Sequence, residues 1–486
     1  MFNRYLVRGA SKHVLRTVAR PLAAVLLAGT LAACKSGPDY RPPAIPDSAM
    51  QPFVTQTVAT DGTAPLPADW WKLYDDPDLN QLIGEAFAAN TDLRVALANM
   101  QRAKGIFDEA HSGLFPSTTA SGGVTYGRDE TTWYGTGQAP MGWTYTGGLD
   151  VSYELDLFGR VRRDIEASRD DAQAVAATYD AVRVAVAAET TRAYVDACSL
   201  GEAIDVANTS IELASSSLRL VSDEERAGAA SHLDVERAGV IQAQAEAALP
   251  PLQGQRQAAL FELAALMGRT PAQVPESARA CVKAPDIAHA LPVGDGTALL
   301  RRRPDVRQAE RQLAADTARI GVAVADLYPR INLGMSGNYL RNDTLKGDRT
   351  FSFAVGPLIS WTFPNVMVAR SRIEQSKAQS AASLARFDGV VLTALKETEQ
   401  TLATYGTALD QRNALVTARD RAERAYRLAE QRFRSGSISY LDVIVAQTSY
   451  IDAKAQVAAA DQRVGSDRVS VFKALGGGWE SADAGR

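Results

Sequence analysis

Two stretches of this chain contain no proline over lengths that few globular helices reach. They cover residues 159–226 and 366–434. A continuous helix over either stretch would be about 100 Å long, because each residue adds about 1.5 Å. Helices in ordinary globular domains average about three turns, so these lengths predict coiled coils or the wall of a tube.

A glycine follows each proline-free stretch and marks a turn. Gly228 and Gly436 can adopt a positive φ, which ends one helix and lets the next begin. Return helices are therefore predicted at about 231–267 and 439–475. The turns carry charged residues at matching positions, namely Arg226 and Arg434 before the glycines and Asp234 and Asp442 after them.

The sequence also repeats itself. Residues 92–94 match residues 305–307, and the turn at Gly228 matches the turn at Gly436. Each half reads as a strand pair followed by long helices, with strands predicted at about 119–126 and 145–158, and at about 331–341 and 351–363. We therefore expect a first repeat at 69–268, a linker at 269–295, a second repeat at 296–476 and a tail at 477–486.

Residues 149–157 alternate between apolar and polar side chains, and three of the polar ones are the acids Asp150, Glu154 and Asp156. Side chains alternate across a strand, so the segment has one apolar and one acidic face. A half-buried strand in a soluble sheet would give the same pattern. In an outer-membrane barrel the apolar face contacts lipid and the acidic face lines a watery lumen. Strands of about ten residues with aromatic residues near their ends favour the barrel.

Four strands are too few to close a barrel, for which about eight is the practical minimum. Lipid offers no hydrogen-bond partner to an open sheet edge, so the chain must pool its strands with copies of itself. Two copies would give a filled interior, whereas three would leave room for water around the acidic face. The sequence therefore predicts an α+β membrane protein of duplicated strand-strand-long-helix units, in which three chains share a β-barrel of about twelve strands. The long helices would form coiled coils or the wall of a long α-helical barrel.

The N-terminus reads as an export signal. Basic residues precede a short apolar stretch at 21–30, which is too short for a permanent membrane span. The string LAAC that ends at Cys34 resembles a bacterial lipobox, which implies removal of residues 1–33 and acylation of Cys34. Lys35 follows instead of aspartate, which favours the outer membrane. Residues 34–68 are expected to form a loop-like lipidated tether, and the alternative is an ordinary signal peptide with a chance cysteine.

Composition and motifs argue against several other functions. A net charge of −4 does not favour binding to nucleic acid. The four histidines and three cysteines are too scattered in the sequence to suggest a metal site. No catalytic motif is present, so we expect no enzyme and no cofactor apart from the covalent lipid on Cys34. Cys198 is predicted to be a small buried thiol, with a disulfide to Cys281 as the alternative in an oxidising periplasm.

Four strings of this sequence resemble the outer membrane factor family. They are GPDYRPP at 37–43, WWKLYDDPDLNQLI at 70–83, YELDLFGRVRR at 153–163 and LLRRRPDVRQAE at 299–310. They are similar to the OprM/NodT-type lipoprotein branch of that family, the relatives of TolC. The resemblance implies a homotrimer in outer membrane lipid with a helical tunnel in the periplasm. It also implies docking to a periplasmic adaptor and an inner-membrane pump, usually of the resistance–nodulation–division (RND) class, and hence a passive efflux duct.

The same resemblance places Asp442 near a constriction of the channel. Three copies would form an acidic ring that arginines such as Arg434 and Arg226 could latch. Asp234 is a further gate candidate, and the turn glycines Gly228 and Gly436 would shape the tips to which the adaptor docks. The alternative is that both aspartates only stabilise helix N-termini.

Two other functions stay open at this stage. The first is an exit duct for type I polypeptide secretion, which would have the same fold. The second is a lipidated periplasmic coiled-coil adaptor, whose strands would form soluble domains.

Overall fold

The computed structural model describes residues 35–55, 59–130, 133–361 and 366–479. The predicted signal peptide, the predicted acylation site Cys34 and most of the tail lie outside these residues. The described chain forms two compact units. The first comprises the described residues of Met1–Pro43, Gln101–Ala174 and Ala309–Phe387. The second comprises those of Ala44–Met100, Val175–Gln308 and Asp388–Arg486.

The first unit contains one antiparallel sheet in the order β2-β3-β5-β6. Its strands are β2 (Ser117–Arg128), β3 (Met141–Glu154), β5 (Arg330–Arg341) and β6 (Phe351–Ser360). The four predicted strands are therefore present, with two in each repeat. The register places Val151 opposite Met335, and Met335 opposite Val355, so apolar residues of neighbouring strands share one face.

The predicted end of β3 was wrong. The alternating pattern extends to Leu157, but the strand ends at Glu154. Asp156 instead accepts hydrogen bonds from the backbone N–H groups of Val161 and Arg162, at 3.1 and 3.0 Å. A carboxylate that binds free N–H groups at a helix start acts as a cap, so Asp156 belongs to the next helix rather than to the strand.

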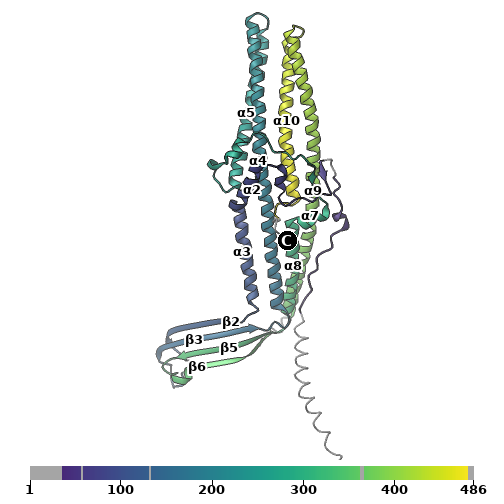
Figure 1. Cartoon of the computed structure of the whole chain (residues 1–486). Helices are drawn as coiled ribbons and strands as arrows, with labels where there is room; N and C mark the ends of the chain where they lie inside the picture. The colour runs from purple at the N-terminus through teal and green to yellow at the C-terminus, as the bar shows by residue number, and fades with distance from the viewer. Residues whose placement is uncertain (1–34, 56–58, 131–132, 362–365, 480–486) are drawn as a thin grey trace, which may run out of the picture. The chain divides into compact units, whose positions relative to one another are not determined.

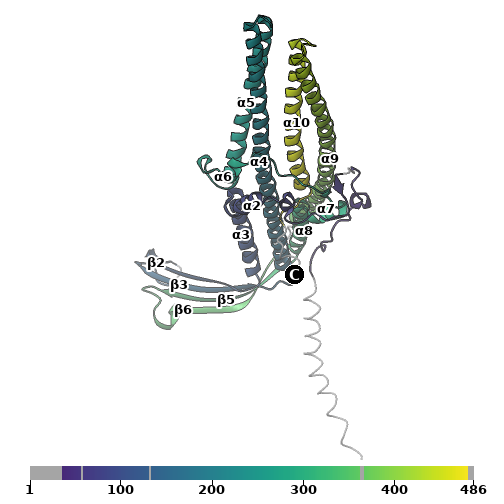
Figure 2. The ribbon, with the colours of Figure 1, turned by 45° about the horizontal axis from the view of Figure 1, so that its top comes forward.

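The long helices form where the proline-free stretches predict them. They are α4 (Arg160–Arg226) and α9 (Val366–Arg434), followed by the return helices α5 (His232–Leu266) and α10 (Tyr440–Ala474). Figures 1 and 2 both show α5 beside α4 and α10 beside α9. Two shorter helices of equal length precede the strand pairs, α3 (Thr91–Ser112) and α8 (Pro304–Ala325), as a duplicated chain would have them.

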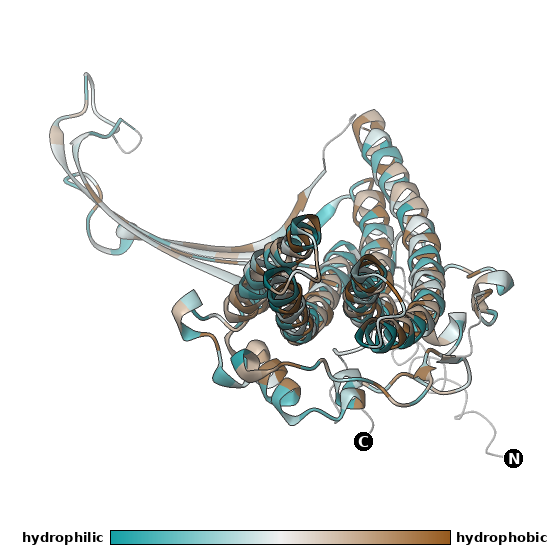
Figure 3. Ribbon diagram, turned by 90° about the horizontal axis from the view of Figure 1, so that it is seen from above, coloured by the Kyte–Doolittle hydropathy of each residue, from teal (hydrophilic) through white to brown (hydrophobic). Residues whose placement is uncertain are grey.

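No helix in the described ranges has both the length and the apolar character that a membrane span requires. Apolar and polar residues are mixed along the long helices (Figure 3).

The core of the second unit is centred on Trp70. Its side chain is fully buried and its ring stacks on Phe472 with 4.6 Å between the ring centroids. Its indole N–H donates to the carbonyl of Gly477 at 3.2 Å. Trp70 lies in a short 3-10 helix (Trp70–Tyr74) before α2 (Pro77–Ala89) and α3, while Phe472 lies in α10, so the start of the first repeat packs on the end of the second.

The tether and the linker are more ordered than the sequence predicts. The tether holds a 3-10 turn (Asp47–Met50) and strand β1 (Thr60–Asp61), which pairs in parallel with β4 (Leu291–Pro292) of the linker. The linker also contains a 3-10 turn (Pro271–Gln273) and α6 (Glu276–Ala280), and α7 (Gly296–Arg302) follows it. The description of residues 34–68 as loop-like was therefore only partly right.

Cys198 and Cys281 form a disulfide, with 5.0 Å between their Cα atoms. The prediction that Cys198 is a buried free thiol was therefore right about burial and wrong about its chemistry, since the side chain is 0% exposed but bonded. The bond joins α4 to the linker residue directly after α6. Arg256 of α5 donates to the carbonyl of Cys281 at 2.8 Å, so three elements meet at this linker position.

Replacement of Cys198 with serine is expected to lower the free energy of unfolding by about 3 kcal/mol, because the disulfide closes a long loop in the unfolded chain. Denaturant titration of the purified protein measures this. The double change with Cys281→Ser should cost no more than the single change, since both remove the same bond. An unchanged unfolding midpoint would mean that the bond does not stabilise the fold.

Candidate functional site

The turn between α4 and α5 has the shape that its sequence predicts. Gly228 adopts a φ of +79°, and its N–H donates to the carbonyl of Glu225 at 2.8 Å. Asp234 closes a capping box with Ser231, whose hydroxyl donates to the carboxylate at 2.7 Å. Hydrogen bonds from Ser231 hold the pKa of Asp234 below its ordinary value. Arg226 pairs with Asp223 of its own helix.

The turn between α9 and α10 repeats this geometry. Gly436 has a φ of +72°, and Asp442 forms a capping box with Ser439, with 2.8 Å between the hydroxyl and the carboxylate. Arg434 pairs with Glu430 one turn earlier, at 2.5 Å. Both candidate aspartates therefore stabilise a helix N-terminus, and both candidate arginines pair with acids of their own helices.

A hydrogen-bonded contact that the sequence does not reveal joins the two hairpins near these turns. The Tyr440 hydroxyl donates to the carbonyl of Ser217 at 3.0 Å, and the Ser217 hydroxyl donates to Gln447 at 2.7 Å. Gln447 is fully buried, and its amide nitrogen has no hydrogen-bond partner among the described residues. Apolar side chains from both hairpins surround the contact, including Val221, Ile241, Val443 and Ile444. We name Ser217, Tyr440 and Gln447 the hairpin latch.

The three acids predicted for a lumen have different environments. Asp150 is exposed on β3, between Thr119 of β2 and Ser336 of β5. Glu154 forms a two-bond ion pair with Arg160 at 2.7 and 2.8 Å. Asp156 caps α4 as described above. Glu154, the last residue of β3, and Asp156 therefore both contact the start of α4, and the place of the three acids in a lumen stays a prediction.

The opposite face of the sheet is apolar and exposed in the single chain. Its central residues include Val355, which is 71% exposed, and Met335, which is 48% exposed. Aromatic residues occupy the same face towards the loop end of the strands, namely Tyr126, Trp143, Tyr145, Tyr339 and Phe351. A continuous exposed apolar face of this kind marks an interaction surface.

The sheet is open within the described chain. β2 and β6 are its outer strands, and each pairs with one neighbour only. Edge strands of this length carry a row of backbone groups that are free to pair with another chain. One face of the sheet is thus suited to an apolar environment, and its edges are suited to further strands.

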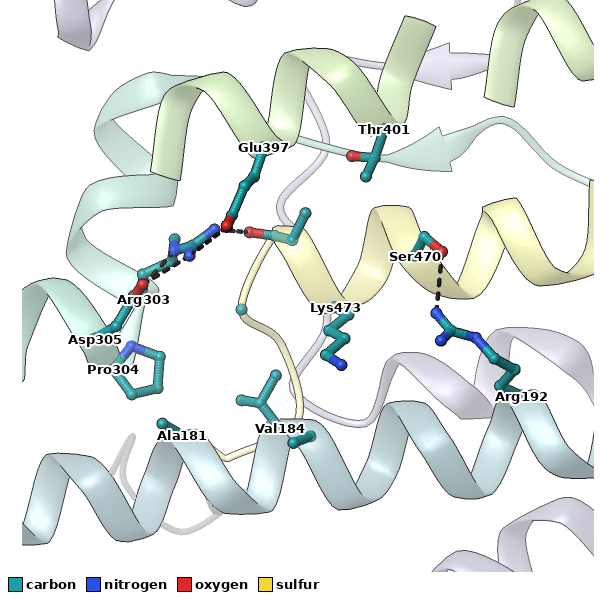
Figure 4. Close-up of a pocket in the computed structure, with 13 residues that line it drawn as sticks. Ala181, Val184, Arg192, Arg303, Pro304, Asp305, Glu397, Thr401, Ser470 and Lys473 are labelled. Carbon is teal, nitrogen blue, oxygen red and sulfur yellow. Dashed lines mark hydrogen bonds and ion pairs between the residues drawn. The ribbon is translucent and has the colours of Figure 1, made fainter. Parts of the chain in front are cut away.

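The string at 299–310 also contributes the buried Arg303, which is the centre of an ion cluster with partly exposed acids. The sequence analysis used this string only as a motif of the family. Arg303 donates to Asp305 at 2.7 and 3.0 Å, to Glu397 at 2.9 Å and to the carbonyl of Ala474 at 2.8 Å. Figure 4 shows Arg303 directed toward Glu397, beside a cavity of about 360 Å³ that Lys473 also lines. Burial opposes the charge on Arg303, but its pairs with Asp305 and Glu397 outweigh burial and raise its pKa.

Among the residues described here, no group of three or more histidine, cysteine, aspartate or glutamate side chains is arranged to hold a metal ion. The features that remain are surfaces, namely an apolar sheet face, two open strand edges and two capped helix turns.

Comparisons with known proteins match most of the chain. The family model for outer membrane efflux proteins matches residues 82–269 and 297–477. Nodulation protein T of Rhizobium leguminosarum bv. viciae is 28% identical over 462 residues, which cover 94% of this chain and 93% of that protein. The toluene efflux pump outer membrane protein TtgI of Pseudomonas putida is 29% identical over 479 residues, which cover 94% of this chain and 98% of that protein.

Among solved structures, the outer-membrane channel OprN has a TM-score of 0.84 to this chain at 32% sequence identity. The match covers 92% of this chain and 100% of that one.

Proposed function

The chain belongs to the outer membrane efflux protein family, and from this premise we propose that it is the outer membrane channel of a tripartite efflux system. It acts as a passive homotrimeric duct for small molecules. An RND-type pump in the inner membrane supplies the energy, and a periplasmic adaptor connects that pump to the duct. Membership of this family sets aside the alternative of a periplasmic adaptor.

The observation that carries this proposal is the four-stranded sheet with one apolar face and two open edges. An open edge is not tolerated in lipid, so the sheet requires partners. Three copies supply about twelve strands, enough for a barrel that encloses water. Asp150, on the polar face, would then line the lumen.

The exported molecules are proposed to be small and apolar or amphipathic, such as drugs and organic solvents. This choice is supported by the similarity to an efflux protein named for toluene. The test compares accumulation of a fluorescent dye, antibiotics, metals and toluene in cells with and without the gene. A several-fold higher accumulation in the deletion strain, restored by the wild-type gene, is expected. No change across the panel, with the trimer present, would favour type I polypeptide secretion.

Two variants test residues whose roles are still predictions. A Cys34→Ser copy tests the proposed lipid anchor, and its product should be held less firmly in the outer membrane fraction, because several acyl chains hold a protein more firmly than none. An Asp442→Asn copy tests the proposed acidic ring at the constriction. It removes charge while retaining a side chain that can accept a hydrogen bond from Ser439.

We place the resting closure of the channel at the helix turns around Gly228 and Gly436, with Asp442, Asp234, Arg434 and Arg226 as candidate gate residues. The hairpin latch supports this placement, because it holds the start of α10 to α4 close to the turns. Burial raises the pKa of Tyr440, so its hydroxyl remains a neutral donor. Opening the tip by separating the hairpins would break both latch hydrogen bonds.

Removal of the latch is expected to make the closed channel leak. The pair Ser217→Ala and Tyr440→Phe removes two hydrogen bonds worth about 1 kcal/mol each, so openings should become at least about tenfold more frequent. Single-channel recording in planar bilayers measures the opening frequency. Ser222→Ala is the matched control, since that hydroxyl donates to the carbonyl of Leu218 in its own helix, at 2.7 Å. Equal frequencies in both variants would rule out the latch.

A further inference from the structure

Residues 35–40, where the described part of the tether begins, lie against α4 and α8 within the first unit. We name this segment the strap. The Ser36 N–H donates to the carbonyl of Phe158 at 3.3 Å, just before α4. The Tyr40 hydroxyl donates to Glu310 of α8 at 2.6 Å. The strap therefore contacts the first repeat through one end and the second repeat through the other.

Arg163 of α4 is the centre of the contact, and its side chain is only 1% exposed. Its donors reach the carbonyls of Ser36 and Gly37 at 3.0 and 3.2 Å, and the carboxylates of Asp39 and Glu166 at 2.8 and 2.9 Å. A buried guanidinium is tolerated only when its donors are satisfied. Three of these four bonds end on the strap, so the strap supplies most of the partners of this buried charge.

Glu166 completes the charge balance of this site. It accepts from Arg163 and also from the Lys35 ammonium at 2.8 Å. Burial alone would raise the pKa of Glu166, but the hydrogen bonds from Lys35 and Arg163 outweigh it and lower the pKa. The strap thus brings its own cation to an acid on α4.

Two glycines allow the strap to lie directly on the backbone of α8. Gly37 has a φ of +81°, and a Cβ placed on it would lie 2.5 Å from the Cα of Gly321. A Cβ on Gly321 would lie 2.6 Å from the carbonyl oxygen of Ser36. Glycine weakens a helix interior relative to alanine, so its presence at this point of α8 fits a need for close approach.

We propose that Arg163, Glu166, Glu310 and Gly321 form a seat that binds the strap. The bound strap braces α4 of the first repeat against α8 of the second. It also holds Lys35, the residue directly after the proposed acylation site, at the start of α4. The position of the lipid anchor is then set by protein contacts and not by the membrane alone. The statement about the lipid rests on the proposed acylation of Cys34, whereas the brace does not.

The test uses the full-length lipoprotein with Arg41→Cys, and a spin label is attached to the new cysteine. Arg41 is exposed and directly follows the strap. Cys34 is consumed by acylation and the other two cysteines form the disulfide, so the new thiol is the only free one. Electron paramagnetic resonance is expected to give slow label motion on the wild-type seat. Motion should be several-fold faster with Gly321→Ala, which blocks the backbone approach, and with Arg163→Gln, which removes the charge.

Gly84→Ala is the matched control. Gly84 also lies inside a helix, but a Cβ there would meet nothing within 4 Å, so label motion should match the wild type. Equal motion on all four proteins would overturn the seat. The heat needed to dissociate the trimer should fall with Gly321→Ala and not with Gly84→Ala, and an unchanged value would overturn the brace.

Two further measurements separate the parts of the proposal. If Gly321→Ala does not assemble, Arg163→Lys keeps the charge but loses the forked geometry and should release the strap partially. Intact mass spectrometry reads acylation directly. An unacylated wild type would overturn the lipid statement alone. The label at position 41 would then be measured with Cys34 replaced by serine, so that it remains the single label and still decides the seat.

Discussion

Replacement of Met335 with arginine is expected to abolish assembly of the channel in the outer membrane. Met335 lies in the middle of β5 on the apolar face, between Val151 and Val355. An arginine at the midplane of a bilayer costs about 2–4 kcal/mol on the lipid face of a barrel, and a trimer would carry three of them. The measurements are outer-membrane fractionation and the heat-dependent trimer band in gel electrophoresis.

The neighbouring residue provides the control. Ser336 lies on the opposite face, between Asp150 and Ala354, so Ser336→Arg should assemble like the wild type. Its expected effect is a shift of ion selectivity towards anions, because a positive ring would face the lumen. If Ser336→Arg failed to assemble and Met335→Arg succeeded, the two faces of the sheet would have to be exchanged.

Replacement of Arg303 with alanine is expected to lower the free energy of unfolding by about 2–4 kcal/mol, because a buried side chain and its charge-assisted hydrogen bonds are lost. Asp305 and Glu397 are 39% and 46% exposed, so water replaces part of what the cation supplies. The change removes two hydrogen bonds to Asp305, one to Glu397 and one to the carbonyl of Ala474. These partners lie on α8, α9 and α10, so the loss should loosen all three. Thermal and denaturant unfolding of the purified trimer measure the effect.

Arg301 offers a comparison within the same run of three arginines. Its side chain is exposed, so Arg301→Ala should change stability by less than about 0.5 kcal/mol. Arg303→Lys keeps the charge but cannot reproduce the forked contacts, and should fall between the two. A cost for Arg301→Ala as large as that for Arg303→Ala would show that the cluster is not the source of the stability.

The parts of the fold that follow from the sequence are those set by local rules. The absence of proline determines the span of α4 and α9, and the glycines at 228 and 436 determine where the return helices begin. The prediction of where β3 ends was wrong for a physical reason. The period-two pattern continues to Leu157, but Asp156 gains more by capping α4 than by extending the strand.

The candidate site likewise has features that follow from local sequence rules and features that do not. The Ser-x-x-Asp spacing before Asp234 and Asp442 is a local signal, and both capping boxes could be read from it. Contacts between distant residues leave no such signal in one sequence. In the sequence, the strings at 37–43 and 153–163 are two separate motifs with no visible relation. In the structure, Arg163 donates a hydrogen bond to the carbonyl of Gly37. The disulfide between Cys198 and Cys281 is hidden for the same reason.

The near-equality of the two hairpins has a consequence for stoichiometry. α5 and α10 are both 35 residues long, and their turns share the same glycine, arginine and capping aspartate. Three copies would therefore present six almost equivalent tips, so a docking protein with one recognition motif could bind six times. The symmetry is broken where His232, with a side chain 76% exposed, corresponds to Tyr440, which is 5% exposed. A partner that reads this difference would bind three times, and the count of bound partners would reveal which tip it recognises.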